Sequence, residues 1–217
     1  SSIAFGTKVD FDAIVLEGIE RVSIEDIKAA ADMGYKIKLL GVTQMTGRGL
    51  EQRMQPCLVP TSSPLGQLQG GTNMIVIEGD AIEQVVLRGP GAGMGPTASA
   101  VMGDVCDIAR GFHLPVFGQP VEMLVESKPA KSTMPAPYYL RMGVVDKPGA
   151  MAKIATVLGE AGISIDRMRQ YGHAETSAPV LIVTHKVSSA AIEAALEAME
   201  STGVLAAAPV ALRIEEV

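Results

Sequence analysis

Tryptophan is absent from this chain of 217 residues, and only four phenylalanines and four tyrosines accompany its aliphatic side chains. The core must therefore be built mainly from aliphatic residues, and the hydrophobic fraction of 47% is large enough to supply one. Such a composition argues against intrinsic disorder, and the length suits one large or two small domains. We expect a well-packed globular protein rich in buried Ala, Val and Ile.

Cysteine and histidine are also scarce. Cys57 and Cys106 lie far apart in segments of different character, and the histidines at 113, 173 and 185 show no metal-ligand spacing. The sequence therefore gives no support to a disulfide framework or a metal site. Thiols without a disulfide pattern fit a reducing compartment, so we expect a cytoplasmic protein.

The chain lacks a basic run and a long apolar run. Eighteen basic residues stand against twenty-four acidic ones, for a net charge of −6, so nucleic acid is not an expected partner. No apolar stretch approaches the roughly 20 residues that cross a bilayer, so a membrane is not expected either. An initiator Met is also missing, and the apolar residues 3–5 follow almost at once. We therefore expect the sequence to be part of a longer protein.

Proline is concentrated in one region. Five of the thirteen prolines fall between positions 111 and 137, together with two lysines among small residues. Proline fixes φ and removes a backbone donor, so this spacing disfavours both helices and central strands. It predicts a linker over 111–137 that separates a first domain, 1–110, from a second, 138–217.

The first domain contains one clear helix signal. Ser23 stands three residues before Asp26, which is a capping-box arrangement, and Gly34 has the position of a C-cap glycine. We therefore expect a helix over 24–33.

Runs of β-prone residues follow that helix. They predict strands over 35–42, 50–59, 72–78 and 81–88, and the Gly79-Asp80 pair suits a tight hairpin between the last two. Together they predict a mainly antiparallel or mixed sheet, with Ile75 and Ile77 on one face.

A glycine-rich stretch over 89–95 leads into a long apolar helix. Its apolar stripe comprises Ala100, Val101, Val105 and Ile108. Glycine-rich loops before a helix can approach phosphates closely, because backbone amides point outward and the helix dipole favours negative charge. The spacing is not G-x-G-x-x-G, however, and glycine serves tight turns equally well. The residues themselves leave a structural turn and a ligand-facing loop both open.

The second domain alternates between strand and helix periods. A strand from 138 to 144 is followed by the turn Asp146-Lys147-Pro148-Gly149 and by apolar residues at helical spacing up to Gly162. Two strands over 163–171 and 179–187 come next, then a helix capped by Ser188 and a strand over 204–213. The order β-α-β-β-α-β predicts a ferredoxin-like unit.

The second domain resembles the ACT domains, which sense amino acids. The resemblance rests on the stretches 140–151, LRMGVVDKPGAM, and 162–166, GISID. It implies that a small amino-acid effector binds where the turn after the first strand meets a neighbouring subunit. The effector-binding residues that it implies are Asp146, Gly149, Ala150, Met151 and Asp166.

The first domain resembles the catalytic region of homoserine dehydrogenase, in which many short matches occur in the same order. The matching residues are Ile3-Ala4-Phe5-Gly6-Thr7, Phe11-Asp12, Glu17-Gly18-Ile19, Asp26-Ile27, the segments 34–41 and 55–60, Ser63-Pro64-Leu65, Asn73, Glu78-Gly79-Asp80, Gly91-Ala92-Gly93 and the segment 96–101.

This resemblance implies an NAD(P)-dependent oxidoreductase that converts aspartate semialdehyde to homoserine. It implies that the catalytic lysine and the nucleotide fingerprint lie upstream of Ser1, so we expect no catalytic residue in this chain and no activity from it alone. Cofactor contact is expected at Gly91, Ala92 and Gly93. In this light Lys8 is expected to be a surface lysine, and Asp10, Asp12 and Glu17 to be solvated loop acids.

The expected fold class is therefore α+β. A mixed sheet with helices, serving substrate binding and dimerisation and ending in a returning helix, precedes a ferredoxin-like βαββαβ ACT domain. The expected assembly is a homo-oligomer, dimer or tetramer, inhibited by an amino acid, with L-threonine the expected effector. The sequence also fits two alternatives, which are an amino-acid-binding module without catalysis and a structural dimerisation core.

Overall fold

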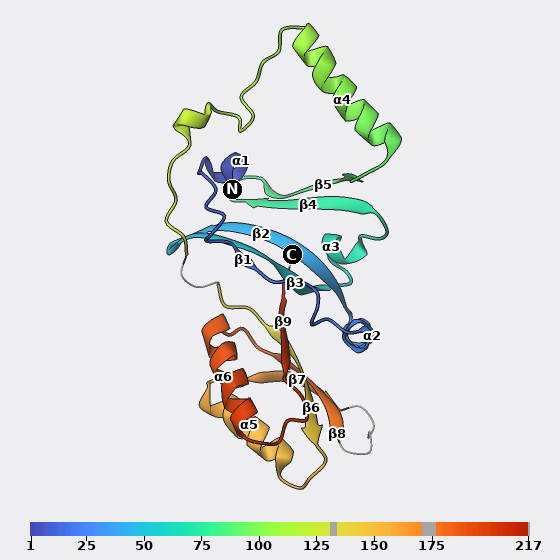
Figure 1. Ribbon diagram of the computed structural model, residues 1–217, viewed down its shortest axis with the longest axis vertical. Helices are drawn as coiled ribbons and strands as arrows, with labels where there is room; N and C mark the ends of the chain where they lie inside the picture. The colour runs from blue at the N-terminus through green and yellow to red at the C-terminus, as the bar shows by residue number, and fades with distance from the viewer. Residues whose placement is uncertain (131–133, 171–176, 217) are drawn as a thin grey trace.

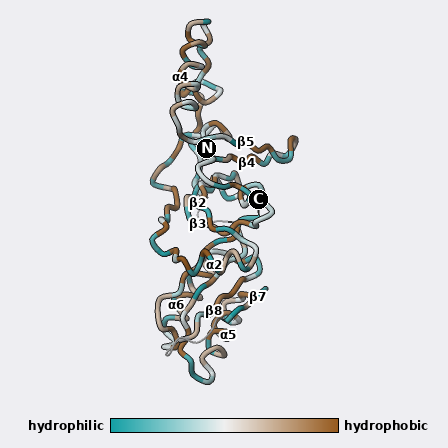
Figure 2. The backbone as a smooth tube through the Cα atoms, turned by 90° about the vertical axis from the view of Figure 1, so that its right-hand side faces the viewer, coloured by the Kyte–Doolittle hydropathy of each residue, from teal (hydrophilic) through white to brown (hydrophobic). Residues whose placement is uncertain are grey.

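The computed structural model describes residues 1–130, 134–170 and 177–216 and has an elongated shape with three tiers (Figure 1). Helices α5 and α6 lie at one end, the long hairpin β2–β3 lies in the middle, and helix α4 lies at the other end. The side view gives the same order of tiers (Figure 2).

The N-terminal residues of the chain lead into helix α2. A short helix α1 (Ser2–Phe5) and strand β1 (Val15–Leu16) precede α2 (Ile24–Asp32). The predicted capping box is confirmed, since the side chain of Ser23 accepts from the backbone of Asp26 and that of Asp26 accepts from the backbone of Ser23. After the helix, Gly34 has φ of 83°, which only glycine adopts easily. This glycine turns the chain directly into β2.

Strands β2 (Tyr35–Thr46) and β3 (Gly49–Pro60) form a long antiparallel hairpin. After the short helix α3 (Pro64–Gln67), strands β4 (Thr72–Gly79) and β5 (Glu83–Pro90) form a second hairpin. The turn at Gly79-Asp80 is in the predicted place but is longer than predicted. Gly79 pairs with Glu83, so three residues form the loop, and Glu83 takes the left-handed conformation with φ of 54°. This is the geometry of a three-residue hairpin loop.

Helix α4 (Met94–Ala109) follows the glycine-rich stretch and has no buried residue. The predicted apolar stripe is present in sequence, but Val101, Val105 and Ile108 are all about half exposed or more. The proline-rich segment then returns along the molecule, with a 3₁₀ turn η1 (Val121–Met123) and single bridges at Thr7–Val125, Leu50–Pro129 and Ala136–Val187. It therefore runs in contact with both parts of the chain.

The C-terminal part has the predicted βαββαβ order. It comprises β6 (Tyr138–Val145), α5 (Ala150–Glu160), β7 (Ile165–Gln170), β8 (Ser177–Thr184), α6 (Ser189–Ser201) and β9 (Val210–Ile214). Ser188 caps α6 as predicted, its hydroxyl accepting from the backbone of Ala191. The mixed sheet with helices and the ferredoxin-like unit confirm the predicted fold class.

One prediction about the sheets was wrong. The strands of the first part do not form a sheet of their own, because β4 and β5 pair only with each other, while β2 and β3 join the strands of the second part. Strand β3 runs parallel to β9 through the pairs Cys57–Arg213 and Leu58–Ile214, which gives a seven-stranded sheet in the order β1-β3-β9-β6-β8-β7 with β2 also paired to β3. A single sheet therefore crosses the predicted domain boundary.

Buried ion pairs hold this crossing together. Arg53 on β3 contacts Glu51 at 2.8 Å and Glu215, just after β9, at 2.9 Å. Glu215 also accepts from Arg213, and Glu51 accepts from the backbone of Met134 in the proline-rich segment. A shift of β3 along β9 would separate Arg53 from Glu215 and leave a buried charge uncompensated. These contacts therefore fix the register of β3 against β9.

Two hydrophobic cores lie on opposite faces of the C-terminal sheet. One is formed with α5 and α6 and includes Leu140, Ile154 and Met199. The other includes side chains from both parts of the chain, with Ala29, Ala30 and Met33 of α2 and its cap against Leu58, Tyr139, Leu181, Val183, Val210, Leu212 and Ile214. Helix α2 of the first part is thus the second helical layer of the C-terminal sheet.

Candidate functional site

The predicted cofactor loop lies at the N-terminus of α4, where Gly91, Ala92 and Gly93 are all exposed. Gly93 is the N-cap residue with φ of 126°, and no side chain caps the helix. Its carbonyl accepts from the backbone of Thr97 at 3.1 Å. The loop therefore offers backbone donors and the positive end of a 16-residue helix, which together suit an anionic or carbonyl group.

Asn73 on β4 is a partner of this loop, and no site role was predicted for it. A side chain at Gly91 would overlap the amide nitrogen Nδ2 of Asn73, so the two residues are in direct contact and a larger residue at position 91 would force Asn73 to move. Their closeness follows from the hairpin register, which pairs Asn73 with Gly89 and so brings Gly91 alongside. The contact between Asn73 and Gly91 cannot be predicted from a local sequence signal, because it depends on the length of the hairpin loop between β4 and β5.

A small pocket of about 180 Å³ lies next to Asn73, between β2 and β4. Its polar wall is Lys38, whose ammonium group donates to the carbonyl of Leu68 at 2.8 Å. The remaining lining residues are mostly apolar: Leu39, Leu40, Leu65, Thr72, Asn73 and Met74. The hydrogen bond from Lys38 to Leu68 joins β2 to the segment that leads into β4.

The predicted effector residues of the first turn lie together at the end of β6. Asp146 is exposed, and Gly149 has φ of 85° at the N-cap of α5, which no side chain caps. Ala150 is less suited to the predicted role, because its side chain is in the core and its backbone N–H donates to the carbonyl of Lys147 at 3.1 Å. Met151 is half-buried against the same core.

Asp166 does not lie with the other four. It stands at a register irregularity at the start of β7, where its carboxylate accepts from Arg167 at 3.0 Å. Val145 pairs with Ser177 at one end of β8, whereas Ile165 pairs with Thr184 at the other end. The distance along β8 from Ser177 to Thr184 is roughly 23 Å at about 3.3 Å per residue, so one small ligand cannot touch both ends of the strand in one chain.

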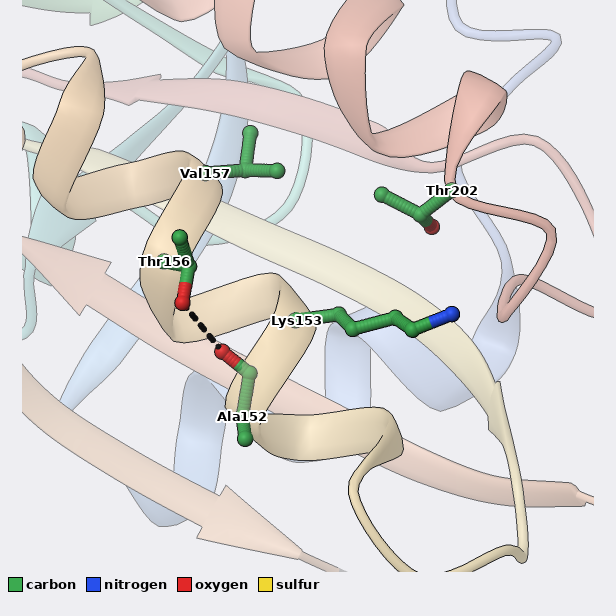
Figure 3. Close-up of a pocket in the computed structure, with 5 residues that line it drawn as sticks. All are labelled: Ala152, Lys153, Thr156, Val157 and Thr202. Atoms are coloured by element: carbon green, nitrogen blue, oxygen red, sulfur yellow. Dashed lines mark hydrogen bonds between the residues drawn. The ribbon is translucent and has the colours of Figure 1, made fainter.

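A shallow groove of about 350 Å³ lies between α5 and the end of α6 (Figure 3). Lys153 extends from α5 beneath Thr202, and Val157 forms an apolar wall. The hydroxyls of Thr156 and Thr202 donate to the main-chain carbonyls of Ala152 and Met199. The groove therefore presents mainly apolar surface and one ammonium group.

Several other titratable groups have structural roles. Lys8 pairs with Glu126 on the surface, and Asp10 accepts from the backbone of Asp12 and Ala13 in a turn.

Among the described residues no group of three or more His, Cys, Asp or Glu side chains could hold a metal ion, and His173 lies outside them. Burial raises the pKa of the Cys57 thiol to about 12, whereas Cys106 is exposed.

With this geometry established, comparison with known proteins decides the family. A family model of homoserine dehydrogenase matches residues 1–106, and one of the ACT domain matches residues 138–204. The chain carries a homoserine dehydrogenase domain followed by an ACT domain. Both families are those that the sequence resembles.

Relatives that align with nearly the whole chain support this assignment. The homoserine dehydrogenase of Neisseria gonorrhoeae is 37% identical over 93% of this chain and 48% of its own length, and that of Pseudomonas aeruginosa is 34% identical over 100% and 52%. The crystal structure of a homoserine dehydrogenase from Thiobacillus denitrificans has a TM-score of 0.87 at 31% identity and covers 99% of this chain and 50% of that one. That of S. aureus, at 23% identity and a TM-score of 0.67, shares the fold. The chain thus spans about half the length of the relatives it matches.

In the described part of the chain no helix is both long and apolar enough to cross a bilayer.

Proposed function

We propose that the whole protein is an NAD(P)-dependent homoserine dehydrogenase that interconverts aspartate semialdehyde and homoserine. The observation that carries this proposal is the homoserine dehydrogenase domain over 1–106, followed by an ACT domain over 138–204, in a chain that is 37% identical to a homoserine dehydrogenase over 93% of its length. The bound nicotinamide would supply hydride to the aldehyde carbon. The proton donor and the dinucleotide fingerprint are proposed to lie outside these 217 residues.

The loop at Gly91, Ala92 and Gly93 fits a partial role in cofactor binding. Its exposed backbone and uncapped helix end can donate hydrogen bonds to a phosphate or carboxamide oxygen, but its three residues present no charged side chain. We therefore expect it to close over one side of a cofactor that other residues hold. Asn73 would fix the position of the loop through its contact with Gly91.

A turnover assay tests this proposal. The 217-residue chain should not oxidise NADPH in the presence of aspartate semialdehyde, whereas a protein of the relatives' full length should do so. Turnover by the pure 217-residue chain would show that the catalytic groups are within it. Absence of turnover by the full-length protein, with NADH as well as NADPH, would contradict the proposed reaction.

The ACT domain is proposed to bind an amino acid, with L-threonine the expected effector and feedback inhibitor. Because Asp166 and the turn at Asp146 and Gly149 lie at opposite ends of β8, the proposed site combines the turn of one copy with Asp166 of another. The uncapped N-terminus of α5 would receive the carboxylate, and an aspartate the ammonium group. The protein is therefore proposed to act as a homo-oligomer.

Calorimetry tests the effector proposal. L-Threonine should release or absorb heat on binding, and Asp166→Asn should weaken its affinity at least tenfold, since it removes the charge that pairs with the ammonium group. Glu193→Gln on the exposed side of α6 is a matched control that should bind normally. The absence of heat with threonine, serine and methionine would contradict amino-acid sensing.

The β4–β5 hairpin favours a second function for this part of the chain, which is self-association. One face of the hairpin carries Ile75, Ile77, Val85 and Leu87, and Ile75 and Leu87 are 60% and 55% exposed. Contiguous exposed apolar residues of this kind mark interaction surfaces. Sedimentation should give a dimer or larger that Ile75→Asp dissociates, and a monomer at micromolar concentration would contradict this assignment.

A further inference from the structure

The start of helix α2 is fixed to the ACT sheet by one buried carboxylate. Asp26 is fully buried, and its Oδ1 accepts from the hydroxyl of Tyr139 at 2.9 Å and from Nε of Arg141 at 2.5 Å. Its Oδ2 accepts from the backbone and hydroxyl of Ser23. The helix cap of the dehydrogenase domain is thus also the ionic partner of strand β6.

The residue that leads from the other end of the same helix into β2 contacts strand β7. Tyr35 follows Gly34 as the first residue of β2, and its hydroxyl accepts from Nη2 of Arg167 at 2.9 Å. The guanidinium carbon of Arg167 lies 5.6 Å from the centre of the Tyr35 ring. Nε of Arg167 is held by the carboxylate of Asp166, the residue to which the proposed effector site assigns the ligand's ammonium group.

The two contacts differ in strength. Side chains of Arg167 and Asp166 are 50% and 39% exposed, so their pairing changes an equilibrium by a factor of about five at most. The pair between Arg141 and fully buried Asp26 is different, because breaking it would change the folding equilibrium by a factor of about a hundred or more. A ligand can therefore displace the pair of Arg167 with Asp166, which orients Arg167 on Tyr35, but not the pair of Arg141 with Asp26.

We propose that α2 transmits the state of the ACT domain to the dehydrogenase domain, fixed at Asp26 and switched at Tyr35. This inference rests on the proposed effector function. An amino-acid ammonium group that pairs with Asp166 competes with Arg167 for the same carboxylate, and Arg167 is then less firmly oriented on Tyr35. The C-terminal end of α2 and the start of β2 are released, while the N-terminal end stays in place.

A series of neighbouring residues leads from Tyr35 along β2 to the glycine loop. Three residues along β2, Lys38 bonds the carbonyl of Leu68, and the pocket beside it is lined by Asn73. Asn73 in turn lies against Gly91. A change at the start of β2 can therefore reach the proposed cofactor loop without a contact between the ACT domain and that loop.

Hydrogen exchange measured by mass spectrometry on the 217-residue chain tests the inference. Saturating L-threonine should speed exchange of the amides over 30–36 about two- to fivefold and leave those over 24–27 unchanged. Tyr35→Phe keeps the ring in its core and removes only the acceptor for Arg167, so it should show the faster exchange without ligand and no further response. Equal responses of the parent and Tyr35→Phe at equal threonine occupancy would overturn the proposal.

Two further variants separate this inference from the effector proposal. Lys186→Met removes a similarly exposed ion pair, with Glu216, elsewhere in the ACT domain and should keep the response to threonine. Asp166→Asn frees Arg167 without any ligand and should by itself speed exchange over 30–36. If no amino acid binds but Asp166→Asn has this effect, the effector proposal fails and the coupling stands. If Asp166→Asn leaves α2 unchanged, the coupling is wrong whichever ligand binds.

Discussion

At the scale of single residues, Asp26 is both a helix cap and one half of a buried ion pair. The sequence predicts the first role, because Ser23 and Asp26 have capping-box spacing and that signal is local. The second role depends on Tyr139 and Arg141, more than a hundred positions away, and their approach depends on the sheet that joins the two domains. No local pattern contains that information.

Arg141→Met should destabilise the chain by about 3 kcal/mol, because it leaves the carboxylate of Asp26 buried without its cationic partner. The methionine keeps most of the side-chain volume, so lost packing adds little. Urea unfolding followed by circular dichroism measures the effect. Lys8→Met, which breaks an exposed pair with Glu126, is the control and should cost less than about 1 kcal/mol. Equal losses for the two variants would show that Asp26 is not effectively buried.

Cys57 should make the fold sensitive to alkaline pH. Its pKa is about 12 in the fold because burial disfavours the thiolate, against 9.0 for an unperturbed thiol. A raised pKa in the folded state contributes stability that is complete below pH 9 and is lost as the pH rises toward 12. By pH 10.5 the loss should be on the order of 2 kcal/mol.

The comparison of the parent with Cys57→Ala in urea at pH 8 and pH 10.5 checks this prediction, since the alanine variant lacks the thiol-dependent part of the loss. A thiol reagent at pH 8 should modify only Cys106 until the chain is unfolded. Rapid native labelling of both thiols would contradict the burial of Cys57.

Gly91→Ala should cost about 1 kcal/mol, because the new methyl group overlaps Nδ2 of Asn73 and that side chain must rotate away. Asn73→Ala in the same chain should remove most of this cost. Gly95→Ala, at a helical position with open space around it, should instead be neutral or slightly stabilising. A Gly91→Ala variant as stable as the parent would mean that Asn73 does not fix the loop.

At the scale of elements, α4 and α5 show how packing decides helix stability. Helix α4 is the longer, with 16 residues against 11, yet it has no buried residue, whereas α5 buries Ala150, Ile154 and Leu158. Isolated helices of this length are marginal in water even with good helix formers, and α4 contains Gly95 and Gly103. The amides of α4 should therefore exchange much faster than those of α5 in this chain. Comparable protection of the two helices would indicate that α4 is covered by another copy or segment.

Elements with local signals could be predicted from the sequence, and pairings could not. The helix after Ser23, the helix after Ser188 and the turn at Gly149 all follow from caps and glycines within a few residues. The hairpin at Gly79 was predicted in place but with too short a loop, because loop length depends on which residues pair across the strands. The same limitation hid the contact between Asn73 and Gly91.

At the scale of the whole molecule, the chain divides into two domains by sequence but not by packing. The βαββαβ order of the ACT domain was predictable because the alternation of its strand residues and the helical spacing of its apolar residues are both strong, and its turns are marked by glycine. The continuation of its sheet through β9 to β3, and the placing of α2 on its second face, were not. The separation of Asp146 from Asp166 also depends on strand pairing, because the parallel strands β6 and β7 place them at opposite ends of the sheet.

This shared core predicts that α2 and the ACT sheet unfold together. Ala30 of α2 and Leu181 and Leu212 of the ACT strands are buried in one cluster, so opening of either side exposes the other and loses about 2 kcal/mol for each large side chain. Native-state hydrogen exchange in increasing urea should therefore bring the amides over 29–33, 180–183 and 210–214 to a single opening free energy and slope. Amides in the exposed β4–β5 hairpin should open at lower free energy, which supplies an internal control. If the ACT strands kept their protection after α2 had opened, the ACT domain would be an independent folding unit, and residues 134–217 alone should then be as stable as they are in the whole chain.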